Sequence, residues 1–154
     1  MDCFCYQTII GEMTILANKN SVTGVNFGRC FSDAQNVESH LIREAFAQLR
    51  EYLSGSKQTF DLDLAPDGSI FQMSVWNELK KIPYGETKTY GEIAVAIGNP
   101  KSCRAVGRAC GQNPISIFIP CHRVIGSDGN LTGYAGGTDI KKKLLEIERA
   151  DKFL

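Results

Sequence analysis

The sequence predicts an α+β protein: a small N-terminal antiparallel sheet with a helix, followed by a mostly helical, winged-helix-like C-terminal domain that contains a helix-turn-helix. Three observations predict this class. Short segments rich in β-branched and aromatic residues fill the beginning of the chain, apolar residues repeat at helical spacing in residues 33–53, and three helical segments follow in residues 69–112. The pattern changes near Pro66, so we divide the chain into residues 1–66 and 67–154.

The first half is typical of a β-meander followed by one helix. The segments CYQTI, MTILAN and VTGVNF are separated by Gly11 and by the polar run NKNS, which favour turns between antiparallel strands. Residues 33–53 then predict a helix that Ser32 or Asp33 caps and Gly55 ends. Its apolar positions are Val37, Leu41, Ala45, Phe46, Leu49 and Leu53. The stretch LSGSKQTFDLDLAPDGS predicts a strand and a turn-rich connector.

The second half begins with three predicted helices. The segment SIFQMSVWNELKKI places Phe71, Val75, Leu79 and Ile82 on one face and stops at Pro83-Tyr84-Gly85. A short helix follows in TYGEIAVAIG, with Thr89 as N-cap and Gly98 at its end. After the turn NPKS, Ser102 can cap the helix SCRAVGRACGQN. Two short helices joined by about four residues form a helix-turn-helix layout, although ordinary helix packing gives the same pattern.

The third of these helices has the features of a surface that approaches another molecule closely. It carries Arg104 and Arg108 among the small residues Ala105, Gly107, Ala109 and Gly111. Residues 67–154 hold twelve basic and nine acidic residues, against five and eight in residues 1–66. A polyanion would therefore bind the second half, with modest affinity from phosphate contacts alone.

The chain then predicts a buried strand, a turn, a loop and a final helix. SIFI is an apolar strand that Pro120 ends, GSDGN is a turn, and GYAGG is a loop whose amides can approach a ligand. The last segment, TDIKKKLLEIERADKF, predicts a helix. Its inward-facing residues would be Ile140, Leu144, Leu145 and Ile147.

Composition excludes several classes of protein. No apolar run approaches the roughly twenty residues of a membrane helix, and the N-terminus lacks a secretion signal. We therefore expect a cytoplasmic protein, or a nuclear one in a eukaryote, whose six cysteines are reduced thiols. Cys3, Cys5, Cys30 and His40 could supply four metal ligands, but their spacing lacks the usual paired zinc pattern, so we expect no metal.

The run Pro-Cys-His-Arg is the candidate for chemistry. A neighbouring imidazole or cation lowers the pKa of a thiol, and Cys121 is followed by His122 and Arg123. Adjacent side chains on a strand point to opposite faces, so the pair can share a pocket only if the strand breaks at Pro120. On local chemistry alone, an inert buried cysteine beside a surface histidine remains an equally good interpretation.

The stretch IPCHRVIGSDGNLTGYAGG, with KKKLLEIE after it, resembles the active-site signature of the O6-alkylguanine-DNA alkyltransferases (methylated-DNA–protein-cysteine methyltransferases). The resemblance extends upstream through FQMSVWNELKKIPYGETKTYGEIAVAIGNPKSCRAVGRACGQNP, whereas residues 1–66 resemble the family only in layout. It implies DNA repair by a single-turnover transfer of an alkyl group from O6-alkylguanine to Cys121, with no cofactor. Residues 1–66 would be structural, and residues 67–154 would bind DNA and accept the alkyl group.

The resemblance also implies roles for individual residues. Cys121 would accept the alkyl group, His122 would remove its proton through a water, and Glu148 would orient the imidazole. Tyr90 would push the target phosphate and donate a proton to the departing guanine. The partner would be double-stranded DNA, bound through its minor groove by a monomer that makes no contact with a membrane. The DNA-binding residues would be Arg104, Tyr90, Ala105, Gly107 and Arg108, with Arg104 as the finger that fills the duplex.

Further residues would form the substrate pocket. Asn113 would be the hinge between the recognition helix and the active-site segment, and Tyr134 would form a wall. Backbone groups of Cys121 and Val124 would read the exocyclic amine, and the Ala135 amide would bind O6. Several relatives have serine where this chain has Ala135, so a hydroxyl contact would be lost. Taken singly, these residues have structural interpretations; Glu148, for example, could form a surface pair with Lys152.

Three alternatives compete with alkyl transfer. Alkyltransferase-like proteins bind alkylated DNA but lack the cysteine, and Cys121 counts against them. A plain DNA-binding regulator would have no need for the thiol in PCHRV, and a cysteine hydrolase would need water to regenerate the thiol. The sequence leaves open which alkyl groups fit, whether O4-alkylthymine is a second substrate, and whether alkylation destabilises the fold.

Overall fold

The computed structural model describes residues 1–29, 34–131 and 133–149. The chain packs as two compact units, each described here by itself. The first comprises Met1–Asp67 together with Pro114–Phe118, and the second comprises Gly68–Asn113 and Ile119–Leu154. The division therefore falls near the predicted boundary, but a short segment of the second half packs with the first unit.

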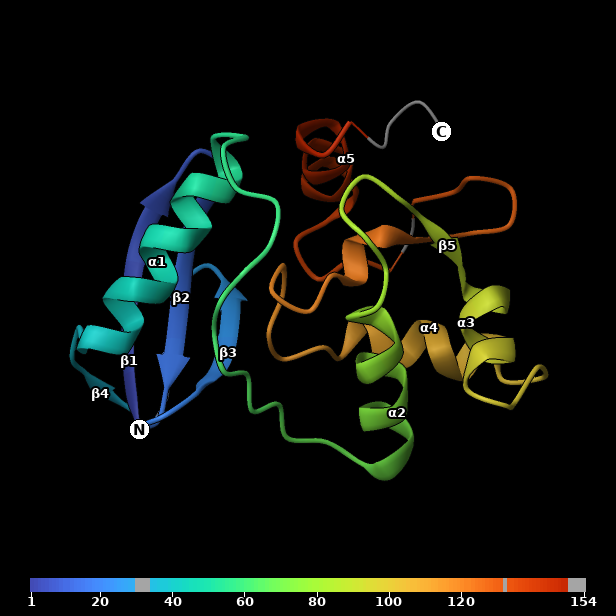
Figure 1. The fold of residues 1–154 in the computed structure, drawn as a ribbon, viewed down its shortest axis with the longest axis horizontal. Helices are drawn as coiled ribbons and strands as arrows, with labels where there is room; N and C mark the ends of the chain where they lie inside the picture. The colour runs from blue at the N-terminus through green and yellow to red at the C-terminus, as the bar shows by residue number, and fades with distance from the viewer. Residues whose placement is uncertain (30–33, 132, 150–154) are drawn as a thin grey trace. The chain divides into compact units, whose positions relative to one another are not determined.

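The first unit is a four-stranded sheet with a helix against it (Figure 1). The strands β1 (Asp2–Thr8), β2 (Gly11–Ala17) and β3 (Val22–Phe27) form the predicted antiparallel meander. A two-residue strand, β4 (Gln35–Asn36), pairs in parallel with β1, so the sheet order is β3-β2-β1-β4. Gly11 makes the β1–β2 turn with a φ of 106°, a conformation that favours glycine.

Helix α1 (His40–Leu53) begins later than the sequence predicted. Ser39 caps it by accepting a hydrogen bond from the amide of Ile42, and the preceding residues enter β4 instead of a helical turn. The predicted caps Ser32 and Asp33 lie outside the described residues. Helical spacing alone could not separate Val37, which is exposed, from the buried positions further along. The buried face of α1 consists of Ile42, Ala45, Gln48, Leu49, Tyr52 and Leu53.

Two predicted strands are only isolated bridges in the first unit. Val22 pairs with Leu64, and Val25 pairs with Ile115, whose neighbour Pro114 accepts a hydrogen bond from the Val25 amide. The SIFI segment is buried, as expected, but it turns at Ile117, which has a φ of 74°. The prediction of a regular strand there was wrong because burial of apolar side chains does not require a ladder of backbone pairs.

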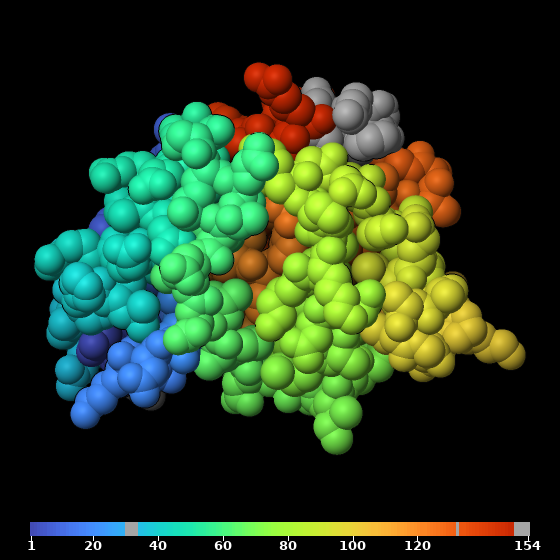
Figure 2. All heavy atoms as spheres, viewed as in Figure 1, coloured from blue at the N-terminus to red at the C-terminus, as the bar shows by residue number. Residues whose placement is uncertain are grey.

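The second unit contains the predicted helix-turn-helix. Its helices are α2 (Ile70–Leu79), α3 (Tyr90–Ala96), α4 (Cys103–Gly111) and α5 (Thr138–Ile147), and η1 (Cys121–Arg123) is a single 3₁₀ turn. Strands β5 (Lys88–Thr89) and β6 (Val124–Ile125) pair in parallel. The exposed turn between α3 and α4, drawn in yellow, stands out from the surface in Figure 2.

Capping explains where these helices begin. Ser69 with Gln72, and Thr89 with Glu92, form complete capping boxes that satisfy the first amides of α2 and α3. Ser102 occupies the predicted N-cap position of α4, but its hydroxyl donates to the carbonyl of Asn99 and does not cap the helix.

The core of the second unit is built around Trp76. Its indole donates a hydrogen bond to the carbonyl of Ala109 at 2.9 Å and so fixes α4 against α2. Phe71, predicted on the buried face of α2, is only partly covered, and Trp76 fills the core instead. On α5, Leu144 and Leu145 are buried as predicted, whereas Ile140 and Ile147 are partly exposed.

Candidate active site around Cys121

The backbone breaks at Pro120 and brings three neighbouring side chains into the interior. Residues Cys121–Arg123 form a 3₁₀ turn in which the amide of Arg123 donates to the carbonyl of Pro120 at 3.0 Å. Cys121 is 4% exposed and His122 is fully buried. A turn does not alternate side chains between two faces as a strand does. The chain thus breaks at Pro120, which was the condition for Cys121 and His122 to share a pocket.

His122 is joined to Glu148 by a short hydrogen bond. The distance between Nε2 of His122 and Oε2 of Glu148 is 2.6 Å, and both side chains are inaccessible to solvent. Glu148 lies directly after α5, at its C-cap, and is 3% exposed. The alternative interpretation of Glu148 as half of a surface ion pair is therefore wrong; Lys152 lies outside the described residues.

The charges around this pair favour an ionised glutamate and a neutral histidine. Burial by itself raises the pKa of Glu148, but the hydrogen bond with His122 and the ion pair with Arg123 outweigh it and hold that pKa well below its usual range. Burial lowers the pKa of His122 and outweighs the attraction of Glu148. Since an ionised carboxylate only accepts hydrogen bonds, the proton of the neutral imidazole must lie on Nε2.

The thiol of Cys121 is held in its protonated form. Burial raises its pKa, and a hydrogen bond from the Asn113 side chain and the charge of Lys141 offset only part of that effect. A thiol of this kind reacts only if a base takes its proton. The imidazole of the adjacent His122 is the base that the structure offers.

Asn113 connects the end of α4 to the segment that precedes Cys121. Its side-chain amide donates to the carbonyl of Ile119 at 2.8 Å, and the residue is buried. The C-cap of α4 is Gln112, so Asn113 follows the helix and does not cap it. The hydrogen bond ties the residue after α4 to the segment before Cys121, and the hinge role of Asn113 stays a prediction.

A buried lysine, Lys141, lies in the same site and was missed by the sequence analysis. Lys141 is 1% exposed; its ammonium donates to the carbonyl of Val124 at 2.6 Å and lies 5.8 Å from the ring centroid of Tyr90. Burial lowers its pKa, against the opposing effect of Cys121. The sequence analysis did not place Lys141 among the inward-facing residues of this helix, but its spacing of three and four residues from Leu144 and Leu145 could have placed it on that face.

Tyr90 begins α3 and lies between α4 and the loop that follows Leu131. A Cβ added to Gly107 would come within 4.0 Å of its ring, and one added to Gly133 would come within 3.8 Å of its hydroxyl. Burial, followed by the nearby cysteines, raises the pKa of Tyr90 to about 12. Tyr90 therefore carries its proton at neutral pH.

The remaining predicted residues lie in the loop before α5 and on the exposed face of α4. Tyr134 is buried with its ring 6.5 Å from that of His122, and Ala135 is exposed in the adjacent turn. On α4, Arg104 and Arg108 are exposed. Ala105 and Gly107 on the same helix are partly exposed, so α4 presents the slim, basic surface that its sequence predicted.

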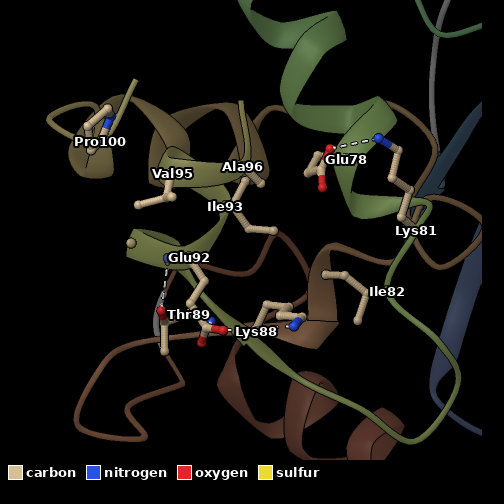
Figure 3. A pocket seen from close by; sticks show the side chains of 11 residues that line it. Glu78, Lys81, Ile82, Lys88, Thr89, Glu92, Ile93, Val95, Ala96 and Pro100 are labelled. Carbon is tan, nitrogen blue, oxygen red and sulfur yellow. Dashed lines mark hydrogen bonds and ion pairs between the residues drawn. The ribbon is translucent and has the colours of Figure 1, made fainter. Parts of the chain in front are cut away.

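A separate hollow of about 700 Å³ lies in the second unit between α2, β5 and α3 (Figure 3). Ile82 and Ile93 line its apolar part. The ion pairs Lys81–Glu78 and Lys88–Glu92 lie at its edge. Neither Cys121 nor His122 lines this hollow, so it is distinct from the candidate active site.

Neither a metal cluster nor a membrane-spanning helix is found among the residues that the structure describes. Among the residues that the structure describes, no cluster of three or more His, Cys, Asp or Glu side chains is arranged to hold a metal ion. Cys30, one of the four candidate ligands, lies outside those residues, and the thiol of Cys5 donates a hydrogen bond to Glu12. No helix within the described part of the chain has the length and apolarity to cross a membrane.

The fold and the site together define a helix-turn-helix protein with a buried cysteine, histidine and glutamate. The chain belongs to the 6-O-methylguanine DNA methyltransferase family: the model of the family's DNA-binding domain matches residues 70–150, and the model of its ribonuclease-like domain matches residues 2–66. The resemblance drawn from the sequence is thereby confirmed, and it also covers the first half of the chain.

Individual relatives are similar over almost their whole length. A methylated-DNA–protein-cysteine methyltransferase of Methanosarcina barkeri is 64% identical over 147 residues, which cover 92% of this chain and 93% of the relative. One from Methanosarcina acetivorans is 49% identical over 148 residues, covering 93% and 95%. The crystal structure of Mycobacterium tuberculosis OGT in complex with DNA is 40% identical, with a TM-score of 0.90, covering 98% of this chain and 94% of the other. These structural similarities confirm the predicted α+β class.

Proposed function

We propose that this protein repairs DNA by transferring the alkyl group of O6-alkylguanine to its own Cys121, once per molecule. The observation that carries the proposal is the buried contact between Glu148 and His122, the residue that follows the buried Cys121, within the domain that matches the family. Residues 67–154 bind DNA and accept the alkyl group, and residues 1–66 have a structural role.

The proposed reaction needs only groups of the protein and a water. His122, through that water, takes the proton of Cys121, and Glu148 stabilises the imidazolium that forms. The thiolate attacks the alkyl carbon, a new S–C bond forms, and the C–O bond breaks with its electron pair moving to the guanine. Tyr90 supplies the proton that the departing guanine requires. The product is a thioether, which no neighbouring group can hydrolyse, so the protein is consumed without any cofactor.

Access to the base requires rotation of the nucleotide out of the duplex, because O6 is out of reach in stacked DNA. The slim helix α4 fits a minor groove about 6 Å wide, and Arg104 would fill the space that the base leaves. Tyr134, the amide of Ala135 and the carbonyl of Val124 would then contact the guanine. The Val124 carbonyl already accepts from Lys141, but a carbonyl has a second lone pair available for the guanine amine.

The proposed partner is double-stranded DNA that carries O6-alkylguanine, bound by a monomer. Low sequence specificity follows from a minor groove in which base pairs are poorly distinguished. The protein would act wherever the cell keeps its DNA: the cytoplasm, or the nucleus of a eukaryote.

Stoichiometric methylation of Cys121 is the direct test. After incubation with an oligonucleotide duplex containing O6-methylguanine, we expect one methyl group per chain, on the peptide that contains Cys121, by mass spectrometry. Cys121→Ala should accept none, whereas Cys5→Ala, which removes a thiol of the first unit, should react like the wild type. Repeated turnover would indicate a hydrolase, and methylation of Cys103 or Cys110 would refute the assignment.

Arg104→Ala should separate base rotation from chemistry. We expect the rate on duplex DNA to fall by about tenfold or more, because the unstacked duplex loses the side chain that fills it, at a cost of a few kcal/mol. The rate on free O6-methylguanine base should stay unchanged, since Arg104 is exposed on α4. Rapid-quench assays with both substrates measure the two rates, and an equal loss on both would contradict the role of Arg104.

A further inference from the structure

Arg123 is a buried cation that the proposed alkyl transfer does not use. Its Nε donates to Oε1 of Glu148 at 2.9 Å and its Nη2 donates to Oε2 of the same carboxylate at 3.1 Å. Its Nη1 donates to the carbonyl of Ile82 at 2.7 Å. The guanidinium therefore forms a bidentate ion pair with one carboxylate through two parallel hydrogen bonds, which the planar guanidinium group of arginine provides and an ammonium group does not.

The carboxylate of Glu148 is held from other sides as well. Its Oε1 also accepts the amide of Gly85 at 3.1 Å, and its Oε2 also contacts Nε2 of His122. The Arg123 guanidinium lies 5.8 Å from the ring centroid of Tyr84, whose hydroxyl donates to the carbonyl of Ile147. Arg123 and Glu148 thus tie the loop after α2 to the end of α5 and to the active-site turn.

This arrangement bears on the protonation of His122. An isolated buried carboxylate at 2.6 Å would favour the imidazolium form, and an imidazolium cannot take the proton of a thiol. The charged groups that act on His122 are Glu148 and Lys141 from the α5 segment and Arg123 from η1; Tyr134 contributes only a ring. Burial lowers the pKa of His122 most, and the two cations act in the same direction against Glu148, so the imidazole is neutral with the carboxylate still in place to accept its Nε2 proton.

We propose that Arg123 is a positioning residue for alkyl transfer: it holds the Glu148 carboxylate against His122 and offsets its charge, so that the imidazole stays neutral and accepts the Cys121 proton. The inference rests on the proposed roles of Cys121 and His122. The local pKa pattern supports it, since Arg123 acts to lower the pKa of both Glu148 and His122.

Nitrogen NMR of the imidazole tests the proposal without any measurement of activity. The chain has only two histidines, and His40 is exposed on α1, so the two signals can be assigned by a His40→Gln variant. We expect His122 in the wild type to be neutral at neutral pH with its proton on Nε2, and to become protonated only below the ordinary histidine range, because burial lowers its pKa. An imidazolium or an Nδ1–H tautomer at neutral pH in the wild type would overturn the proposal.

Arg123→Met and Arg123→Lys extend the test to the reaction. In a plot of transfer rate against pH, the fall of the rate toward low pH should begin at a higher pH in Arg123→Met than in the wild type. At a fixed acidic pH, the rate should be about tenfold lower for each pH unit of this displacement. Arg123→Lys keeps the positive charge but loses the bidentate hydrogen bonding, so the pH at which its transfer rate falls should lie between those of the wild type and Arg123→Met. Both should approach the wild-type rate at high pH. Lys143→Met, which removes an exposed cation of α5, should leave the profile unchanged.

The alternative outcomes separate the inference from the proposed function. If the variants lose thermal stability while the pH dependence of their transfer rate and the imidazole signals match those of the wild type, Arg123 is only structural and the proposal fails. If the wild type places no methyl on Cys121, the proposed function fails, whereas the NMR result on His122 and Arg123 still stands.

Discussion

Glu148→Ala should destabilise the protein by about 3–5 kcal/mol, because it leaves the buried guanidinium of Arg123 without its carboxylate. For a chain of this size, that corresponds to a drop in Tm of roughly 6–20 °C. The loss should exceed that of Glu146→Ala, since Glu146 is exposed on the same helix. Differential scanning calorimetry at neutral pH measures both variants.

The double variant Glu148→Ala with Arg123→Met sharpens this prediction. It removes both partners of the ion pair and leaves no buried charge, so it should be more stable than Glu148→Ala alone. Equal stability of the single and double variants would show that Arg123 finds another partner, and a loss as small as that of Glu146→Ala would contradict the importance of the pair.

The pH dependence of stability follows from the same contact. The pKa of Glu148 is depressed in the folded state, so its contribution is fully present above the pKa of an unfolded glutamate, about 4.3, and is lost as the pH falls toward the lower folded value. Between pH 5 and acid denaturation, the wild type should therefore lose more stability than Glu148→Ala. Parallel curves of unfolding free energy against pH for the two proteins would contradict this.

Lys141→Met should slow alkyl transfer at neutral pH, by about tenfold for each unit by which the pKa of the Cys121 thiol rises, because the fraction of thiolate falls in that proportion. The charge of Lys141 opposes the rise that burial causes in the pKa of Cys121, and methionine has a similar shape without that charge. Measured as a function of pH, the rate of Cys121 alkylation should rise at a higher pH in Lys141→Met than in the wild type. Much of the lost rate should therefore be recovered in alkaline solution.

Lys142→Met is the matched control for Lys141→Met. Lys142 follows Lys141 directly on α5 and is exposed, so its replacement removes the same charge from the chain without changing the site. Equal rates in the two variants would refute the role of Lys141, as would a rate loss in Lys141→Met that alkaline solution does not restore.

Local signals in the sequence were sufficient for most helices, whereas local chemistry left Cys121 undecided until the family resemblance was considered. The N-cap at Thr89 and the glycine after α3 located the first helix of the helix-turn-helix because they act within a few residues of the chain. The start of α1 was wrong, since the pairing of β4 with β1 depends on a strand more than thirty residues away. The SIFI strand was wrong for a similar reason: burial was visible in its composition, but the turn at Ile117 was not.

The sequence by itself determined the helical pattern of the second half and, through the family pattern, predicted Cys121 as the nucleophile, His122 as its base and Glu148 as the residue that orients the imidazole. Only the tertiary structure decided that Arg123 points inward to the carboxylate of Glu148. It likewise decided that Lys141, alone among three consecutive lysines, is buried near Tyr90 and Cys121. The physical reason is that a charged side chain is buried only where distant parts of the chain supply its partners. Those partners are the end of α5, the carbonyl of Ile82 and the carbonyl of Val124, and no local pattern of residues specifies where they meet.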